Sequence, residues 1–409
     1  MNQNNVGSSK QILIIGGGTA ALSAAKAARA QDSDVGITMI SAESRLPYYR
    51  LRLCDYIGKS IDYNKIQINN EDWFETNRIR VELSKKVTDV DADAKKVTAD
   101  GEDYSYDSLI VATGSTPIMP PFKGKELSGV HSIWTCEDIE ALNKSLADTE
   151  KAVVIGGGLL GLESAHKISG MGIDVTLIEG MPRLLPKQLD EDGSEVFREK
   201  VESLGISVIC GKAVAGFEGD DKGHVRYVRM NDDTLLDADV VVVTVGVAPN
   251  TAICQDSGMD IERFLIVNDK METSIRDIYA AGDVACMNGR WFGQWSVASG
   301  QGQVAGTNAA GGDVVYKVTN VPYMLASMET RVVCSGDIGA SQQDQSGDTY
   351  DINQTYDKNQ FSYSRLVFRD GVFVGYVLIG EPSKVFNKLQ SLIQTRTSAE
   401  NINNILYES

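Results

Sequence analysis

The stretch QILIIGGGTAALSAAKAA, residues 11–28, joins a β-branched apolar run to three glycines and then to an alanine-rich segment. A similar stretch, KAVVIGGGLLGLESAHKI, occupies residues 151–168. Each is followed by a second mainly apolar run, at residues 36–40 and 174–178. The order strand, glycine turn, helix, strand is typical of the βαβ unit of a parallel sheet. Its occurrence twice predicts an α/β protein with two doubly wound, Rossmann-like domains.

The small residues of both stretches have the spacing that a bound dinucleotide requires. The first glycine allows a tight turn, the second lets a diphosphate approach the backbone, and the third small residue lets the helix pack closely on the strand. The diphosphate would lie at the positive end of the helix dipole. We expect dinucleotide contacts from Gly16, Gly18 and Ala21 in the first motif and from Gly156, Gly158 and Gly161 in the second.

An acidic residue after each second strand indicates which dinucleotide is bound. Glu179 stands 23 residues after Gly156, where a carboxylate can accept both hydroxyls of an adenosine ribose and would repel a 2′-phosphate. The second motif is therefore expected to prefer NADH to NADPH. Arg183 lies close by in sequence and is interpreted as a solvent-exposed side chain. In the first motif Glu43 is the nearest carboxylate and the expected ribose ligand.

Charge and composition exclude several classes of partner. The chain has 409 residues, with 39 Lys and Arg against 56 Asp and Glu, for a net charge of −17. This acidity argues against nucleic acid or an anionic membrane as the main partner. No apolar stretch approaches the roughly 20 residues that a membrane span needs, and the polar start, MNQNNVGSSK, does not resemble a signal sequence. We expect a cytoplasmic protein of two or three domains.

The cysteines and histidines form no metal-binding or dithiol pattern. All six cysteines lie at least 32 residues apart, so CxxC and CxxxxC pairs are absent from the sequence. That spacing argues against a thioredoxin-type dithiol, a zinc ribbon and a sequence-local iron–sulfur site. The three histidines also lack a metal-ligand spacing, and no metal is expected.

Three further segments match a known family when they are taken with the two glycine motifs. They are LIVATGS at 109–115, VTVGVAPN at 243–250 and TSIRDIYAAGDVA at 273–285. Over about residues 11–312 the chain resembles the FAD/NAD(P) oxidoreductases of the pyridine nucleotide-disulphide reductase type. The resemblance implies that the first glycine motif holds FAD and the second holds NADH. It also implies cofactor contacts from Ala112, Thr113, Gly114, Gly246, Gly282 and Asp283.

Two other segments narrow the resemblance within that superfamily. LPYYRLRLCDYI at 46–57 and YSRLVFRDGVFVGYVLIGE at 363–381 are similar to segments of NADH:rubredoxin reductases and of related ferredoxin and nitrite reductase flavoproteins. In the first segment Leu51 replaces a family proline. By this resemblance Trp295 lies on the flavin side. The resemblance also implies that Tyr48 and Arg50 lie beside the flavin and that Glu163 lies near its nicotinamide-facing side. These three are the expected catalytic residues.

The same reasoning divides the chain into three domains. We expect an FAD-binding domain from residues 1–115 and 250–312, an NAD-binding domain from 116–249, and a C-terminal α+β domain from 313–409. Two alternating runs, 361–368 and 372–379, flank a short glycine-containing loop and predict a hairpin in the last domain. Helical spacing follows at residues 381–395.

The absence of a cysteine pair shapes the expected function. Electrons from NADH would leave the flavin directly for an external acceptor, and a small iron protein such as rubredoxin or ferredoxin is the leading candidate. Such proteins are usually acidic, so a local basic patch would have to offset the net charge. Its candidate side chains are Arg45, Arg50, Arg52 and Lys59.

Three alternatives stay open at this point. An NADH oxidase or peroxidase would use Cys54, whose thiolate the nearby Arg50 and Arg52 could favour. An unpaired cysteine is more often a small buried hydrophobic residue, and Cys54 is interpreted in that way first. The chain would otherwise be the flavoprotein subunit of a larger redox complex, or a non-enzymatic flavoprotein sensor. A homodimer is also compatible with the sequence.

Overall fold

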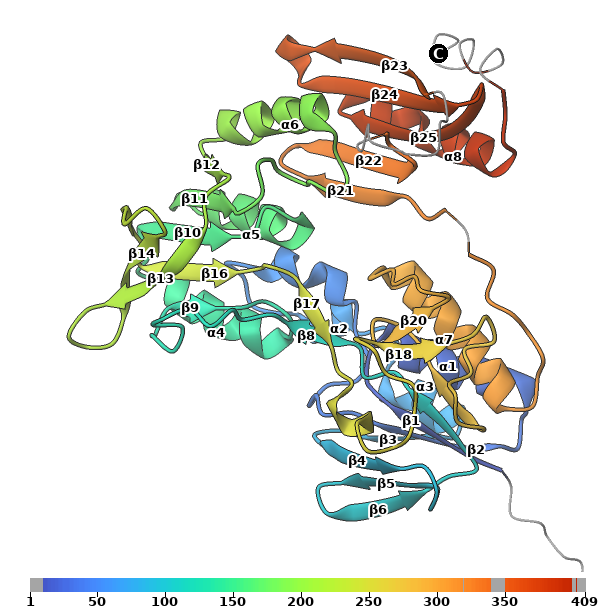
Figure 1. Ribbon diagram of the computed structural model, residues 1–409. Coiled ribbons are helices and arrows are strands. Elements are labelled where there is room, and N and C mark those ends of the chain that lie inside the picture. Colours follow the sequence, from blue (N-terminus) through green and yellow to red (C-terminus); the bar gives the residue numbers. More distant parts are fainter. Residues whose placement is uncertain (1–9, 319, 340–349, 399–401, 403–409) are drawn as a thin grey trace, which may run out of the picture. The chain divides into compact units, whose positions relative to one another are not determined.

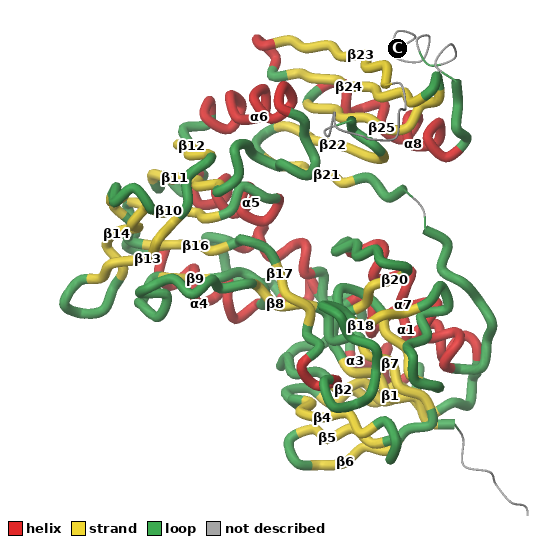
Figure 2. Tube along the Cα trace, in the orientation of Figure 1, coloured by secondary structure: helices red, strands yellow, loops and turns green. Residues whose placement is uncertain are grey.

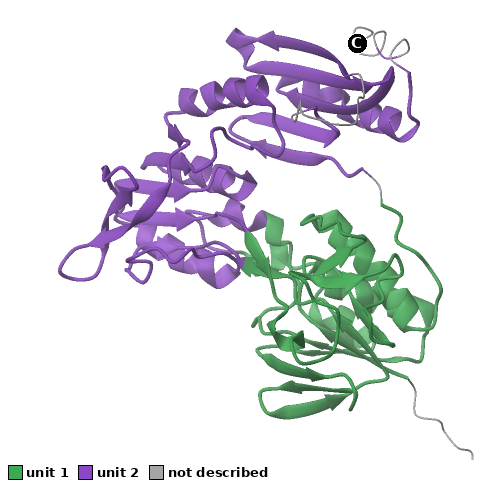
Figure 3. Cartoon of the chain, viewed as in Figure 1, with its two compact units in different colours: residues 1–51, 62–116, 247–318 green, residues 52–61, 117–246, 319–409 purple. Residues whose placement is uncertain are grey.

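The computed structural model describes residues 10–318, 320–339, 350–398 and 402, and Figure 1 labels its elements. The chain divides into two compact units, which Figure 3 colours separately. The first unit contains residues 1–51, 62–116 and 247–318, and the second contains 52–61, 117–246 and 319–409. Apart from Lys10, the polar N-terminal tail lies outside the described residues.

A five-stranded parallel sheet forms the centre of the first unit (Figure 2). In spatial order its strands are β19 (Ile278–Ala280), β7 (Ser108–Val111), β1 (Gln11–Ile15), β2 (Gly36–Ile40) and β3 (Ile79–Glu82). All four residues of β7 are buried, as are those of β1 after Gln11, as expected for parallel strands covered on both faces. Ile15 pairs with Ile40 and with Val111, so the first glycine turn leaves the sheet at its carboxyl edge.

Helices α1 (Thr19–Gln31) and α7 (Trp295–Ala309) pack tightly against each other in this unit. A Cβ at Gly302 would overlap the carbonyl oxygen of Ala20, and one at Gly306 would overlap that of Ala24. Small residues therefore let the two backbones touch. This packing holds α1 firmly behind the glycine turn from which it starts.

The remaining elements of the first unit lie around this core. An antiparallel sheet contains β4 (Val87–Asp91), β5 (Lys96–Ala99) and β6 (Glu102–Ser105), and β18 (Leu265–Val267) pairs with β20 (Ala285–Met287). The short helices are α2 (Tyr63–Ile66), α3 (Glu71–Thr76) and the 3₁₀ segment η2 (Ala252–Cys254). Two short strands, β8 (Ser115–Pro117) and β17 (Val247–Pro249), pair with each other, and Pro117 is the one residue of the pair assigned to the second unit. The 3₁₀ segment η1 (Arg50–Tyr56) has residues 50 and 51 in the first unit and 52–56 in the second.

The second unit contains another five-stranded parallel sheet. Its order is β12 (Ser207–Cys210), β11 (Asp174–Glu179), β10 (Lys151–Ile155), β16 (Val240–Val243) and β9 (Val130–His131). Its helices are α4 (Cys136–Leu146), α5 (Leu159–Ser169) and α6 (Glu191–Ser203), and a small antiparallel sheet contains β13 (Val214–Gly219), β14 (Val225–Met230) and β15 (Leu235–Asp237). Ile155 pairs with Ile178 and with Val243, so the second glycine turn also leaves from the carboxyl edge.

The C-terminal part of the second unit is an antiparallel sheet with one helix. Its order is β21 (Tyr323–Ser327), β22 (Thr330–Gly336), β25 (Val372–Ile379), β24 (Ser362–Arg369) and β23 (Tyr350–Asp357), with η3 (Lys358–Gln360), η4 (Glu381–Val385) and α8 (Phe386–Gln394). Leu389 and Ile393 of α8 share a core with Phe368 and Phe373. The expected hairpin corresponds to β24 and β25, with Asp370 and Gly371 at positive φ in its turn.

The predicted fold class is confirmed. Two Rossmann-like parallel sheets and a C-terminal α+β part are present, whereas the three-domain boundaries stay a prediction. The sequence of residues 81–87 also predicts one short strand. That prediction is wrong, because the chain turns at Ser84, with φ of 54°, between β3 and β4. Within the described ranges, no helix is long and apolar enough to cross a bilayer.

Candidate functional site

The first glycine turn uses its glycines in two different ways. Gly16 has φ of +136°, and a Cβ there would overlap the carbonyl oxygen of Ala112, so only glycine fits this position. Gly18 has an ordinary extended conformation, with φ of −89° and ψ of −172°. A Cβ at Gly18 would meet no described atom within 4 Å. Neither backbone strain nor internal packing therefore explains a glycine at position 18.

The second glycine turn repeats this contrast. Gly156 has φ of +114°, and a Cβ there would overlap the carbonyl oxygen of Thr244. A Cβ at Gly161 would overlap the carbonyl oxygen of Gly156, which shows how closely α5 packs on β10. Gly158 has φ of −84° and open space around its Cβ position within the described chain. The second glycine of each motif thus faces free space at the start of a helix.

These two helix starts fit the diphosphate of a dinucleotide. Among the described residues, no side chain caps the first turn of α1 or of α5. The first N–H groups of a helix have no partner within it, and they carry a partial positive charge. A diphosphate would satisfy these groups and would occupy the space beside Gly18 or Gly158.

Glu179 ends β11 and is held next to the second glycine turn. Its Oε2 accepts a hydrogen bond from the N–H of Gly157 at 2.7 Å, and its Oε1 accepts one from the N–H of Met181 at 2.8 Å. A carboxylate has about four lone-pair positions, so Glu179 can still accept hydrogen bonds from ribose hydroxyls.

Arg183 is half-buried and donates to the carbonyls of Pro186 and Leu189 at 3.3 Å. Its interpretation as a solvent-exposed side chain is wrong, because these bonds fold it onto its own loop.

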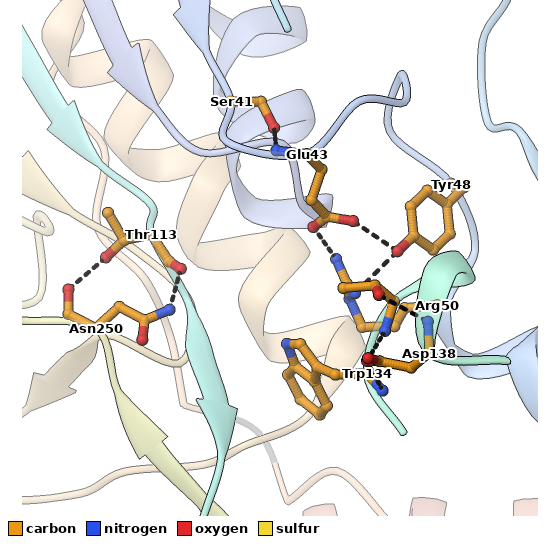
Figure 4. A network of polar contacts seen from close by, with 9 residues as sticks. Ser41, Glu43, Tyr48, Arg50, Thr113, Trp134, Asp138 and Asn250 are labelled. Carbon is orange, nitrogen blue, oxygen red and sulfur yellow. Dashed lines mark hydrogen bonds and ion pairs between the residues drawn. The ribbon is translucent and has the colours of Figure 1, made fainter. Parts of the chain in front are cut away.

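Polar side chains lock the turn at Ala112, Thr113 and Gly114 (Figure 4). The hydroxyl of Thr113 donates to the carbonyl of Asn250 at 2.8 Å, and the amide of Asn250 donates to the carbonyl of Thr113 at 2.9 Å. The N–H of Asn250 also donates to the carbonyl of Gly114 at 3.0 Å. The sequence interpretation did not assign Asn250 a role, although it ends the quoted segment VTVGVAPN.

Asp283 has a similar support, and it follows β19, the strand that pairs with β7. The Ser115 hydroxyl donates to its Oδ2 at 2.8 Å, and burial raises the pKa of the Asp283 carboxyl. The N–H of neighbouring Gly282 donates to Oε1 of Gln301, which is 2% exposed. Ser115 and Gln301 are further residues that the sequence interpretation missed. Ser115 is the last residue of the quoted segment LIVATGS, but it was given no role, and Gln301 lies in none of the quoted segments.

Three predicted residues after β2 form one closed network (Figure 4). Tyr48 donates to Oε2 of Glu43 at 2.6 Å, and Arg50 forms an ion pair with Oε1 of the same carboxylate. Arg50 also donates to the Tyr48 hydroxyl at 2.9 Å. Glu43 is thus fixed by both neighbours, and its role as a ribose ligand stays a prediction. Trp295 lies nearby in the same unit, with its ring centroid 5.9 Å from that of Tyr49.

Glu163 lies on α5 and is half-buried, next to the buried side chains of Cys54 and Ser164. The Cys54 thiol is 4% exposed and lies 3.8 Å from the Ser164 hydroxyl. Burial, followed by the charge of Glu163, raises the pKa of the Cys54 thiol to about 12. Burial, followed by Asp55, raises the pKa of Glu163 to about 7. The expectation that nearby arginines favour a Cys54 thiolate is therefore wrong.

Comparison with known proteins identifies the family. Residues 10–302 match the family model described as pyridine nucleotide-disulphide oxidoreductase. This chain belongs to that family. Residues 323–397 of this oxidoreductase match the model described as rubredoxin NAD+ reductase C-terminal domain, and this range contains the C-terminal sheet. Members of the pyridine nucleotide-disulphide oxidoreductase family typically bind FAD and NAD(P), which agrees with the two glycine turns.

Individual relatives refine this assignment. The NADH-rubredoxin oxidoreductase of Clostridium acetobutylicum is 37% identical over 333 residues, covering 81% of this oxidoreductase and 82% of the relative. Its crystal structure matches 98% of this chain and 100% of that chain with a TM-score of 0.80. The nitrite reductase [NAD(P)H] of Bacillus subtilis is 32% identical over 388 residues, which is 94% of this oxidoreductase. This chain spans only 47% of that relative's length.

Each unit thus gathers its own part of the predicted site. The first unit contains both predicted flavin-side groups, the network of Glu43, Tyr48 and Arg50 and the supported Asp283. The second unit contains Glu179 and Glu163, as well as Gly246, whose carbonyl accepts a hydrogen bond from the N–H of Ile118 at 2.9 Å. No group of three or more metal-binding side chains occurs in the described ranges.

Proposed function

We propose that this chain is an FAD-dependent NADH:acceptor oxidoreductase that passes electrons to a small iron protein of the rubredoxin or ferredoxin class. One observation supports it above the others: Gly18 and Gly158 are glycines that the described fold does not itself require. A diphosphate bound at each helix start would explain why the residue there is glycine. Two such sites in one chain fit one flavin dinucleotide and one nicotinamide dinucleotide.

The chain's residues bind and orient these groups. In the first unit the N–H groups after Gly18 would hold the FAD diphosphate, and Asp283, oriented by Ser115, would accept a ribitol hydroxyl. In the second unit the N–H groups after Gly158 would hold the NADH diphosphate, while Glu179 would accept the ribose hydroxyls. FAD, when bound, supplies a two-electron acceptor that can release electrons singly.

Glu163 supplies proton chemistry in this proposal. Its pKa of about 7 places the carboxyl near even occupancy of its two protonation states at neutral pH. A carboxyl group in that condition can hold or release a proton without a large cost in free energy. The buried Cys54 thiol beside it keeps its own proton, since its pKa is about 12.

The acceptor is proposed from the C-terminal match and from the Clostridium acetobutylicum relative, whose name states rubredoxin as its partner. The test is steady-state oxidation of NADH with rubredoxin, ferredoxin or oxygen as the sole acceptor, over a salt series. We expect the favoured iron protein to be reduced at least tenfold faster than oxygen. Equal rates with oxygen would overturn the choice of acceptor. A rate that falls as salt rises would support docking on local basic side chains.

A second candidate is an electron-input subunit of a larger redox system. It is favoured by the Bacillus subtilis nitrite reductase, which matches 94% of this chain but is about twice as long. In that case turnover with added rubredoxin and with ferredoxin would both be slow, and an iron–sulfur protein would co-purify with the chain.

Replacing Glu179 by arginine is expected to reverse the nucleotide preference. The variant loses the carboxylate that accepts ribose hydroxyls and gains a cation that can pair with a 2′-phosphate. We expect the ratio of kcat/KM for NADH to that for NADPH to fall by about a hundredfold, equivalent to about two charge-assisted hydrogen bonds. Lys187→Glu, a charge change at an exposed position of the same loop, is the control. An unchanged ratio in Glu179→Arg would remove Glu179 from the ribose site.

Replacing Cys54 by serine tests the oxidase alternative. Because the thiol is buried and protonated, we expect NADH-dependent oxygen consumption to stay within about twofold of wild type. Cys254→Ser is the matched control, since burial also raises the pKa of that thiol to about 12. A loss of oxygen consumption confined to Cys54→Ser, measured with an oxygen electrode, would favour the oxidase or peroxidase reaction instead.

A further inference from the structure

The loop from β11 to α6, residues 180–190, connects the proposed ribose ligand to the C-terminal sheet. At its start, Glu179 receives the N–H bonds described above. In its middle, the N–H of Leu185 donates to the carbonyl of Gly157 at 3.2 Å, which ties the loop to the glycine turn. Leu184 and Leu189 are fully buried. The geometry around Glu179 therefore depends on where this loop is fixed.

The far end of the loop is fixed by a buried ion pair. Asp190 is the last loop residue, and its Oδ2 accepts hydrogen bonds from the Tyr363 hydroxyl at 2.7 Å and from Nη1 of Arg365 at 3.2 Å. Both donors belong to β24 of the C-terminal sheet. The side chains of Asp190 and Arg365 are each 8% exposed. Asp190 thus takes its position from residues more than 170 places away in sequence.

Arg365 is itself held rigidly. Its guanidinium donates to the carbonyl of Ile338 at 3.0 Å, to the carbonyl of Gly339 at 3.3 Å and to Oε1 of Gln354 at 2.8 Å. A planar group with several donors in use can move little. The position of the Arg365 guanidinium therefore fixes the position of the Asp190 carboxylate.

The connection continues from Asp190 back to the middle of the loop. Ser194, in the first turn of α6, donates from its hydroxyl to the carbonyl of Leu184 at 2.9 Å. Leu184 precedes the residue bound to Gly157. A continuous series of hydrogen bonds and covalent links thus runs from Arg365 to the glycine turn beside Glu179. Buried ion pairs often add little net stability. We therefore attribute to the pair of Asp190 and Arg365 a role in holding the loop in one conformation.

We propose that Arg365 and Tyr363 are positioning residues for NADH, through which the C-terminal sheet holds the adenosine-ribose site in its binding geometry. This inference rests on the proposed role of the second glycine turn and Glu179. The pair acts through Asp190 and the loop and does not itself touch the nucleotide. The C-terminal part of the chain then sets affinity for NADH as well as any contact with an acceptor.

Two variants and one matched control test the proposal. Tyr363→Phe removes one hydroxyl from Asp190 and keeps the ring, whereas Arg365→Gln removes the charge. Lys358→Gln is the control, because Lys358 lies in η3, between β23 and β24, and forms its ion pair with Glu199 of α6, at 3.4 Å, and not with a loop residue. The full chain with its flavin is titrated with ADP-ribose by calorimetry. Steady-state KM for NADH, kcat and the melting temperature are then measured on the same samples.

The expected result is weaker nucleotide binding at an unchanged rate of turnover. We expect the Kd for ADP-ribose and the KM for NADH to rise about threefold in Tyr363→Phe and about tenfold in Arg365→Gln, with kcat within twofold. Lys358→Gln should match wild type. A lower melting temperature with an unchanged Kd would overturn the proposal, since the residues would then be merely structural.

Two outcomes separate this inference from the proposed function. If wild type binds ADP-ribose and both variants bind it equally well, the inference fails and the proposed function stands. If wild type does not bind ADP-ribose, the proposed nucleotide site fails and the inference falls with it. Tyr363→Phe keeps the test decisive if Arg365→Gln does not fold.

Discussion

Gly158→Val is expected to abolish NADH binding while leaving the fold and the bound flavin unchanged. The position has an ordinary extended backbone, and a Cβ there meets no described atom within 4 Å, so the fold leaves room for a side chain to begin. The same side chain would occupy the place of the diphosphate beside the first turn of α5. We expect the Kd for ADP-ribose to rise by at least about a hundredfold, equivalent to losing roughly two hydrogen bonds to a charged group.

The measurement combines calorimetry with thermal unfolding. We expect the free energy of unfolding to fall by no more than about 1 kcal/mol, because Gly158 is the N-cap residue of α5 and valine is a poorer N-cap residue than glycine. Gly156→Ala is the contrasting variant, because its Cβ would overlap the carbonyl of Thr244 and its φ is +114°. It should lower the melting temperature. Tight ADP-ribose binding by a folded Gly158→Val protein would contradict the proposed site.

Gly18→Val is expected to remove FAD from the chain by the same mechanism. Its backbone is extended and its Cβ position is open within the described fold, so the protein should fold without the flavin. We expect purified Gly18→Val to be nearly colourless, with an affinity for added FAD at least about a hundredfold below wild type. Flavin content is measured from the visible spectrum of the purified protein and of the released cofactor.

The two valine variants are controls for each other. Gly158→Val should keep FAD and lose ADP-ribose binding, whereas Gly18→Val should lose FAD and keep ADP-ribose binding. Melting temperatures are compared between flavin-free samples, because bound FAD itself stabilises the folded state. Loss of both ligands in either variant would show damage beyond the mutated turn.

The architecture could be predicted because its signals are local. Each βαβ unit lies within about 30 residues, and the glycine spacing carries its own structural reason at Gly16 and Gly156. The hairpin of β24 and β25 is also a local feature, and it was predicted to within one residue at its start and end. In contrast, a single strand was wrongly predicted at residues 81–87, where a turn at Ser84 separates β3 from β4.

The supporting contacts could not be predicted because they join distant parts of the chain. Thr113 and Asn250 are 137 residues apart, and Ser115 and Asp283 are 168 apart. Neither Asn250 nor Ser115 belongs to a pattern that points to its partner. The effect of the arginines on the Cys54 thiol was wrongly predicted for a related reason. The sequence shows the neighbouring arginines, but the pKa of the thiol is raised by burial and by Glu163, which lies on α5.

Anaerobic stopped-flow mixing of the flavin-loaded protein with NADH shows whether hydride passes from NADH to the flavin. We expect NADH to bleach the visible flavin absorbance, NADPH to do so much more slowly, and added rubredoxin or ferredoxin then to restore the colour. A flavin that stays oxidised in the presence of NADH would contradict hydride transfer and leave the chain a flavoprotein of another kind.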